Sequence, residues 1–273
     1  IRYGIRKSNA NLGHVMKRSP LAPSVQSPLT AVDGAQLNTA HTGIKYKDRD
    51  DVMIMCFDQP VAVAAVLTRS LTASAPVDWC RKVLSKGQTR AILCNAGNAN
   101  AFTGAAGAVA AERCAQAVAE AGGYSADQVM LASTGVIGEV LPDDLIIPHI
   151  AALMANSAST DSKWLAAAEA IRTTDTFAKA ASRQTNIGGT IITITGIAKG
   201  SGMIAPDMAT MLSFIATDAD LPSAVLQDVL SRLTDQSFNA ITVDGDTSTS
   251  DTVIMAATAS AKHPPVASAH DDV

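Results

Sequence analysis

Residues 196–219 read "GIAKGSGMIAPDMATMLSFIATDA" and connect a run of β-branched residues to a second apolar run. Between these runs, residues 199–212 hold glycines and a proline that let the chain bend, but no histidine and no cysteine. The small residue Ala209 directly precedes Thr210 in this bend. The order of residues admits two interpretations: an ordinary junction between a strand and a loop, or a site where a threonine hydroxyl acts as a nucleophile.

A threonine can act as a nucleophile without histidine when its own α-amino group is the base, because that amine titrates at about 7.7 to 8.0. An internal threonine such as Thr210 reaches this state if its hydroxyl attacks the carbonyl of Ala209 and water then cleaves the resulting ester. The attack needs a small preceding residue, a flexible or strained approach, and donors for the developing oxyanion. Composition alone does not choose between this chemistry and an ordinary junction.

The composition predicts a globular protein that acts on small molecules. Of its 273 residues, 47% are hydrophobic and 17% charged, which is enough for a sizeable core, and the 4% of aromatic residues makes that core aliphatic. The net charge is −4 and no dense Lys/Arg face is visible, which gives no support for nucleic acid or an anionic membrane as a partner. No apolar run reaches the roughly 18 residues that a membrane span needs, so we expect a soluble protein.

The cysteines and the first residues of the chain indicate in which cellular compartment the protein is expected. The cysteines are widely spaced and form no CxxC pair, so reduced, buried thiols and a cytoplasmic location are expected for Cys56, Cys80, Cys94 and Cys114. Residues 1–18 carry five basic residues and no acid, which is typical of a transit peptide and would indicate a mitochondrial location. No long amphipathic Arg/Ser stretch develops there. We therefore favour Met16 as the true start and expect residues 1–18 to be an extension that is disordered or not native.

Apolar runs alternate with helix-forming segments along the chain, which predicts an α/β fold. Residues 51–57 and 61–68 are expected to form two neighbouring strands, because the turn signal "DQP" separates them. Further strands are expected at residues 89–95, 128–134 and 188–198, and helices at residues 108–123, 161–172 and 221–233. The last helix is expected to bury one apolar stripe, made of Val225, Leu226, Val229, Leu230 and Leu233.

Several kinds of site are excluded or disfavoured by the residues present. The histidines lie in tails or ordinary contexts and no GxSxG elbow occurs, which argues against a histidine-based triad, and no cluster has the spacing of a zinc site. "GSGMIA" (200–205) fits a dinucleotide fingerprint, but Pro206 and Asp207 fall where a helix should extend. "DGDTSTSD" (244–251) resembles a calcium loop, yet it lacks the required Gly and Glu, so we interpret it as turns that cap the next element.

The sequence as a whole resembles the ornithine acetyltransferase family, the bifunctional glutamate N-acetyltransferases of arginine biosynthesis. The similarity runs from about Ser19 to Ala259 and is carried by six segments in the family's order. They are "GIKYKDRDDV" (43–52), "NAGNANAFTG" (95–104), "ASTGVIGEVLP" (132–142), "AIRTTDTFAK" (170–179), the opening stretch 196–219, and "TVDGDTSTSDT" (242–252).

This resemblance implies a reaction. The precursor would cleave itself between Ala209 and Thr210, and Thr210 would take an acetyl group from N-acetylornithine and pass it to glutamate, with no cofactor or metal. Whether acetyl-CoA also serves as a donor is left open by the sequence. An amidohydrolase or aminopeptidase of the same self-cleaving architecture, with water as acceptor, is the first alternative, and a dinucleotide-binding module is the second.

The resemblance also implies roles for other residues. Thr134 and Gly135 match the residues that stabilise the oxyanion, through a hydroxyl and a backbone N–H. Lys199 matches a lysine that binds substrate, and an ammonium group is a suitable partner for the α-carboxylate that both substrates carry. Thr173 and Thr174 match the region of another substrate contact, with Thr210 itself completing the expected substrate-binding set.

The fold and assembly expected from the resemblance are a layered α/β sandwich of mixed sheets with outer helices. Residues 19–209 would form the α-chain portion, and residues 210–273 the start of the β-chain portion. The two products would stay together and assemble as a heterotetramer. The family continues well past the position of Val273 and places further substrate-binding groups there, so we expect the substrate pocket formed by these residues alone to be incomplete.

Overall fold

The structure is a computed structural model that describes residues 18–202, 211–245 and 247–269. Its strands are β1 (Gln36–Ala40), β2 (Val52–Leu67), β3 (Gln88–Asn98), β4 (Val129–Val136), β5 (Lys179–Ile187), β6 (Thr190–Lys199), β7 (Leu212–Thr217) and β8 (Thr252–Ala257). Its α-helices are α1 (Ala75–Val83), α2 (Gly104–Gly122), α3 (Asp143–Ala155), α4 (Asp161–Ala170) and α5 (Ser223–Gln236), and single 3-10 turns lie at Leu84–Lys86, Ala126–Gln128 and Phe238–Ala240. The predicted α/β class is confirmed.

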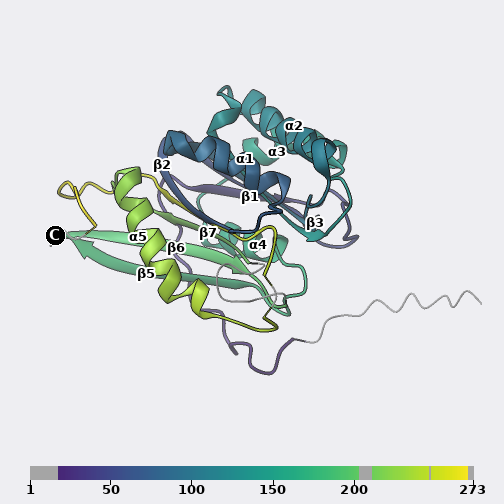
Figure 1. The fold of residues 1–273 in the computed structure, drawn as a ribbon. Helices are drawn as coiled ribbons and strands as arrows, with labels where there is room; N and C mark the ends of the chain where they lie inside the picture. Colours follow the sequence, from purple (N-terminus) through teal and green to yellow (C-terminus); the bar gives the residue numbers. More distant parts are fainter. Residues whose placement is uncertain (1–17, 203–210, 246, 270–273) are drawn as a thin grey trace, which may run out of the picture.

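The strands form one mixed sheet in the order β4-β3-β2-β8-β7-β6-β5, with β1 paired to β2. The pairs β3–β4 and β7–β8 are parallel, and the remaining pairs are antiparallel. Parallel pairs need a crossover connection, which α2 supplies between β3 and β4 and α5 supplies between β7 and β8 (Figure 1). A mixed sheet with helices outside it is thus present, as expected.

Strand β2 bends within the sheet and differs from the sequence prediction for this part of the chain. The segments 51–57 and 61–68 do not form two neighbouring strands; they are halves of one strand, with a register shift between Cys56 and Val61. Such an irregularity lets a strand bend without ending, and Pro60, which has no N–H to donate, lies exposed at the bend. The first half of β2 pairs with β1 and β3, whereas the second half pairs with β8 and keeps contact with β3 only at Val61 and Ala62.

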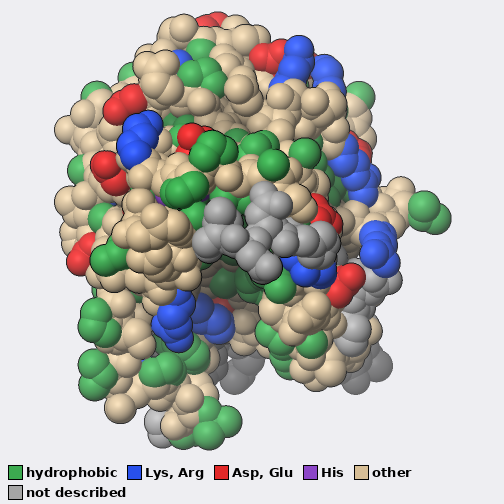
Figure 2. Space-filling model, turned by 90° about the vertical axis from the view of Figure 1, so that its left-hand side faces the viewer, with side chains coloured by type: hydrophobic (Ala, Val, Ile, Leu, Met, Phe, Trp, Pro, Cys, Tyr) green, Lys and Arg blue, Asp and Glu red, His purple; other side chains and the backbone are tan. Residues whose placement is uncertain are grey.

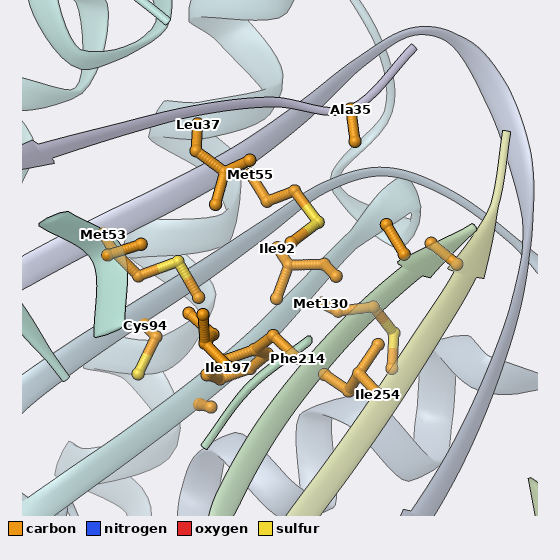
Figure 3. Close-up of a cluster of buried hydrophobic side chains, with 14 of the residues drawn as sticks. Ala35, Leu37, Met53, Met55, Ile92, Cys94, Met130, Ile197, Phe214 and Ile254 are labelled. Atoms are coloured by element: carbon orange, nitrogen blue, oxygen red, sulfur yellow. The ribbon is translucent and has the colours of Figure 1, made fainter. Parts of the chain in front are cut away.

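The bend lets the two halves of the sheet share one core. Met53, Met55 and Ile92 from the β1–β4 half lie in the same buried cluster as Phe214 and Ile254 from the other half. Figure 3 shows these side chains converging between the strands. The cluster is aliphatic and sulfur-rich, as the composition predicts, and Trp164 of α4 is its largest fully buried member.

Helices cover both outer faces of this arrangement. Helices α2 and α3 bury Val118, Ile146 and Ile150 against the outer face of β2, β3 and β4. On the other side, α5 buries Leu226 and Leu230 against β2 and β8. The result is a layered α/β sandwich whose strand ends bring distant segments of the chain together.

Candidate functional site

The site lies where the end of β6 meets the beginnings of β7 and β8. Lys199 is the last residue of β6 and pairs with Leu212, the first residue of β7. Leu212 in turn pairs with Thr252, the first residue of β8. The main-chain N–H of Thr252 also donates to the carbonyl of Met211 at 3.1 Å. Segments that are about fifty residues apart therefore meet at one edge of the sandwich.

The side chain of Lys199 connects this edge to the end of β4. Its Nζ donates a hydrogen bond to Thr134 Oγ1 at 2.8 Å, and both residues are buried. Burial lowers the pKa of the Lys199 ammonium below its ordinary value, while the carboxylates of Asp175 and Asp251 act in the opposite direction. Lys199 thus places a cation beside the hydroxyl of Thr134.

Gly135 shapes the backbone beside Thr134. Its φ is +136°, in a region that favours glycine, and its backbone lies against that of Gly97 in the parallel strand β3. A Cβ at position 135 would lie 2.3 Å from the carbonyl carbon of Gly97. A larger residue could not occupy this position unless the ends of β3 and β4 separated.

Asp175 ties the loop before β5 to the end of β6. Its Oδ1 accepts a hydrogen bond from the Gly200 amide at 2.8 Å and another from Lys179 Nζ, and its carboxylate is buried. Burial alone would raise the pKa of the Asp175 carboxyl, but the bonds from Lys179 and Gly200 outweigh this and hold it below its ordinary value. Asp175 is therefore ionised and holds the backbone next to Lys199.

Asp251 holds the beginning of β7. Its Oδ1 accepts from the Met211 amide at 2.8 Å, and its main-chain carbonyl accepts from the Thr68 amide at 2.9 Å. The carboxylate is fully buried, and Oδ2 has no hydrogen-bond partner in the structure of residues 18–202, 211–245 and 247–269. Burial raises the pKa of Asp251 to about 7, although the Met211 amide and the Lys199 charge oppose this.

A pocket of about 540 Å³ opens beside this cluster. Its lining includes Lys179, Lys199, Gly200 and Met211. The remaining wall is mainly apolar and is formed by Phe177, Phe238, Ile241 and Val243 with Ser19, Thr176, Ala198 and Ser201. A mostly apolar pocket with two lysines in its lining suits a small molecule that carries a carboxylate.

The residues predicted from the sequence are placed as follows. Thr134, Gly135 and Lys199 come together at the ends of β4 and β6. Thr173 is half-buried and Thr174 exposed, and neither lines the pocket, although the Thr173 amide lies 3.5 Å from Asp175 Oδ2. The predicted cleavage pair, Ala209 and Thr210, lies outside the described residues.

The sequence patterns do not single out two buried acids of this cluster. Asp175 lies inside the quoted "TTDT" and Asp251 closes the quoted "DGDTSTSD", but both were interpreted only as parts of loops. For Asp251 the available signal was an acid directly before the first residue of an apolar strand, where burial would need a specific partner.

The alternative sites receive no support from the geometry. A dinucleotide unit needs a strand, a helix and a parallel strand, but β6, which precedes Gly200, is antiparallel to β7, the next described strand. Within "DGDTSTSD", the Ser250 amide donates to Ser248 Oγ at 3.0 Å, as a capping turn does. Within the described ranges, no group of three or more His, Cys, Asp or Glu gathers as metal ligands would.

The surface and the helices bear on the partners expected from the sequence. On the face in Figure 2, Lys and Arg side chains are dispersed among acidic and apolar ones. None of the helices in the described part of the chain has the length and apolarity to cross a bilayer. The cysteines are free and buried, as predicted.

Comparisons with known proteins identify the family. A model of the ArgJ family matches residues 36–272. The arginine biosynthesis bifunctional protein ArgJ of Mesorhizobium japonicum is 51% identical over 243 residues, which are 89% of this chain and 58% of that protein. The corresponding protein of Rhizobium meliloti is 53% identical over the same shares of both chains. This chain therefore spans a little over half the length of these curated relatives.

Two solved structures are similar in sequence and fold. The arginine biosynthesis bifunctional protein ArgJ of Bacillus halodurans is 36% identical, with a TM-score of 0.60 over 65% of this chain and 92% of that one. Ornithine acetyltransferase of Mycobacterium tuberculosis, solved with ornithine, is 33% identical, with a TM-score of 0.57 over 66% of this chain and 94% of that one. From the family match and these similarities, the chain belongs to the ArgJ family.

Proposed function

We propose that this protein transfers an acetyl group from N-acetylornithine to glutamate, a reaction of arginine biosynthesis, through an acetyl ester on Thr210. Support comes from its relatives, which are named for arginine biosynthesis, and from the M. tuberculosis neighbour, an ornithine acetyltransferase that was solved with ornithine. Because the chain spans 58% of its curated relatives, the proposal concerns the portion of the site that these residues carry.

One observation carries the proposal: Lys199 donates a hydrogen bond to Thr134 at the edge of the sheet where Asp251 accepts from the Met211 amide. Met211 directly follows Thr210 in the sequence. The residues expected to stabilise an oxyanion therefore lie at the same edge of the sandwich as Met211, the residue that directly follows the expected nucleophile in the sequence. Acyl transfer needs this combination of nucleophile and oxyanion donors.

The first step in the proposed mechanism is cleavage. Thr210 Oγ attacks the carbonyl carbon of Ala209, the peptide C–N bond breaks, and the acyl chain moves to Oγ as an ester. Water then hydrolyses the ester, which leaves a carboxylate on Ala209 and both an amine and a hydroxyl on Thr210. The solved chains support this step indirectly: both are shorter than this chain, while the curated relatives are longer, as expected for cleavage products.

Acetyl transfer follows in two half-reactions. The Thr210 amine accepts the hydroxyl proton as Oγ attacks the acetyl carbon of N-acetylornithine, and the proton passes to the departing amine of ornithine. The amine of glutamate then attacks the acetyl ester, which releases N-acetylglutamate and restores the hydroxyl. In each half-reaction, the Thr134 hydroxyl and the Gly135 N–H donate to the oxyanion.

Substrate contacts are proposed for Lys199, Thr173 and Thr174. Lys199 lines the pocket and can pair with the α-carboxylate common to both substrates. The two threonines belong to the loop that Asp175 ties to Gly200, so they can contribute from the rim of the site. Acetyl-CoA is proposed as an additional donor, in keeping with the bifunctional name of the relatives.

We also propose how the products are organised. Residues 19–209 form one chain and residues 210 onward the other, and two such pairs assemble as a heterotetramer. The buried free thiols support a reducing compartment, for which we propose the cytoplasm. Size-exclusion chromatography with light scattering of the complete protein checks the assembly.

A transfer assay tests the proposed function. The complete protein is incubated with N-acetylornithine and glutamate, and ornithine and N-acetylglutamate are quantified by mass spectrometry. Equal amounts of both products are expected from the wild type and neither from Thr210→Ala, whereas Thr185→Ala, on the exposed strand β5, should behave as the wild type. Ornithine with free acetate in place of N-acetylglutamate would indicate a hydrolase and contradict the proposal.

A further inference from the structure

The Thr134 hydroxyl is a hydrogen-bond acceptor in the contact with Lys199. An ammonium group has three hydrogens and no lone pair, so Lys199 Nζ must be the donor across the 2.8 Å to Thr134 Oγ1. A hydroxyl has one hydrogen of its own besides its two lone pairs. In the described part of the chain, Thr134 Oγ1 has no other hydrogen-bond partner, so its own hydrogen remains available for a bond into the site.

The surroundings strengthen this contact. Thr134 and Lys199 are 2% and 3% exposed, and a bond from a charged donor is stronger where water is excluded. The other charged groups that act on Lys199 are the carboxylates of Asp175 and Asp251 and the ammonium of Lys179. Among the described residues, no acid lies within 4.0 Å of the Lys199 ammonium, so its bonded partner is the threonine hydroxyl.

We propose that Lys199 is a positioning residue that acts on acetyl transfer through the Thr134 hydroxyl, a role that rests on the proposed function and is separate from binding a substrate carboxylate. The lysine holds the Thr134 oxygen, directs the hydroxyl hydrogen towards the reacting carbonyl, and polarises the O–H bond. Because an ammonium has three hydrogens, the same group can serve Thr134 and a substrate carboxylate at once.

The two roles of Lys199 have different kinetic signatures. A carboxylate is present before and during the reaction, so losing its partner raises KM. Negative charge on the acetyl oxygen develops only in the transition state, so a weaker Thr134 donor lowers kcat. If Lys199 acts through Thr134, replacing Lys199 should therefore lower kcat only when the Thr134 hydroxyl is present.

A double-mutant cycle tests this inference. In the complete protein, kcat and KM for N-acetylornithine are measured for the wild type, Lys199→Met, Thr134→Val and the double variant. Lys199→Met should lower kcat by about tenfold or more, which approaches the roughly hundredfold loss expected on removing an oxyanion donor itself. In the Thr134→Val background the same substitution should change kcat less than about twofold, because the polarised group is absent.

Controls separate this result from a loss of structure. Each variant is checked for cleavage and melting temperature, and Lys199→Gln, which keeps an N–H donor without the charge, replaces Lys199→Met if the latter does not fold. Thr134→Ser retains a hydroxyl and should restore the dependence of kcat on Lys199. Lys179→Met removes the other ammonium of the pocket without touching Thr134, so its effect should be the same in both Thr134 backgrounds.

The outcomes are distinct. Equal effects of Lys199→Met on kcat with and without the Thr134 hydroxyl would overturn the inference, as would a change confined to KM. A cleaved wild type that transfers no acetyl group would overturn the proposed function and, with it, this inference.

Discussion

The sequence identifies Lys199 and Thr134 as site residues, each by its own motif, but it does not predict the hydrogen bond between them. Each was selected through its motif, and "KGSG" and "STGVIG" lie more than sixty residues apart. Their contact depends on how the ends of β6 and β4 are brought together across the sandwich, which no local pattern encodes. The same applies to Asp175 and Asp251, whose partners Gly200 and Met211 come from other parts of the chain.

At Gly135 we predict that a methyl group is not tolerated. Gly135→Ala would place a carbon 2.3 Å from the Gly97 backbone in addition to straining a left-handed φ. Gly138 also has a positive φ, of 88°, but has nothing within 4 Å of its Cβ position, so Gly138→Ala isolates the backbone strain. Gly135→Ala should cost at least about 2 kcal/mol more than Gly138→Ala in urea unfolding. Equal losses would show that the contact with Gly97 is unimportant.

At Asp251 we predict a pH-dependent stability. Its pKa rises from an ordinary value of 3.8 to about 7, so the folded chain binds the proton more tightly than the unfolded chain. The stability that this proton provides is complete below about pH 4 and is lost as the pH rises to about 7. Asp251→Asn can still accept the hydrogen bond from the Met211 amide. Relative to the wild type, its free energy of unfolding should therefore increase as the pH rises from about 4 to about 7, by at most about 1.4 kcal/mol per pH unit. Urea unfolding at several pH values measures this, and a constant difference would contradict it.

At the level of elements, the sequence predicted three of the helices and most strands of the first part of the chain, but not the apolar strands β7 and β8. The helix predicted at 108–123 is α2, which begins four residues earlier, and those predicted at 161–172 and 221–233 are α4 and α5. Leu233 was expected in the buried stripe of α5 but is exposed. Strand β5 was not predicted, because its largely polar sequence "KAASRQTNI" is held in place by pairing with β6 rather than by burial.

Helix α4 is held in place by the burial of one large side chain as well as by its helix-forming sequence. Its N-cap is Thr160, whose hydroxyl accepts from the Lys163 amide. Trp164 of this helix is fully buried between the halves of the sheet. Trp164→Ala should destabilise the protein by about 3 to 5 kcal/mol. Leu165→Ala, one position along on the exposed side, should cost less than about 1 kcal/mol. Similar losses for both variants in thermal unfolding would contradict this account of the core.

At the scale of the whole molecule, the segment after the proposed cleavage point is built into the middle of the sheet. Strand β7 lies between β6 and β8, and β8 lies between β7 and β2. Helix α5 is also fixed to β2, because the Gln227 side chain bonds both the N–H and the C=O of Ala65 at 3.0 Å. The α/β class was predictable from the alternation of patterns, but this interlocking depends on strand order, which the sequence pattern left open.

The interlocking predicts that cleavage does not separate the products. Phe214 of β7 and Ile254 of β8 belong to the shared core, so dissociation would expose a large apolar surface. The two fragments should elute as one species in size-exclusion chromatography and separate only in denaturant. Elution of free fragments under native conditions would contradict the strand order.

The central claim is that Thr210 carries the acetyl group. The complete protein is incubated with N-acetylornithine alone, digested, and analysed by mass spectrometry for the peptide that begins at Thr210. We predict a peptide with a free N-terminal amine at Thr210 and one acetyl group on its hydroxyl, and we expect glutamate to remove that group. An intact Ala209–Thr210 bond, or an unmodified Thr210 while ornithine is released, would contradict the claim.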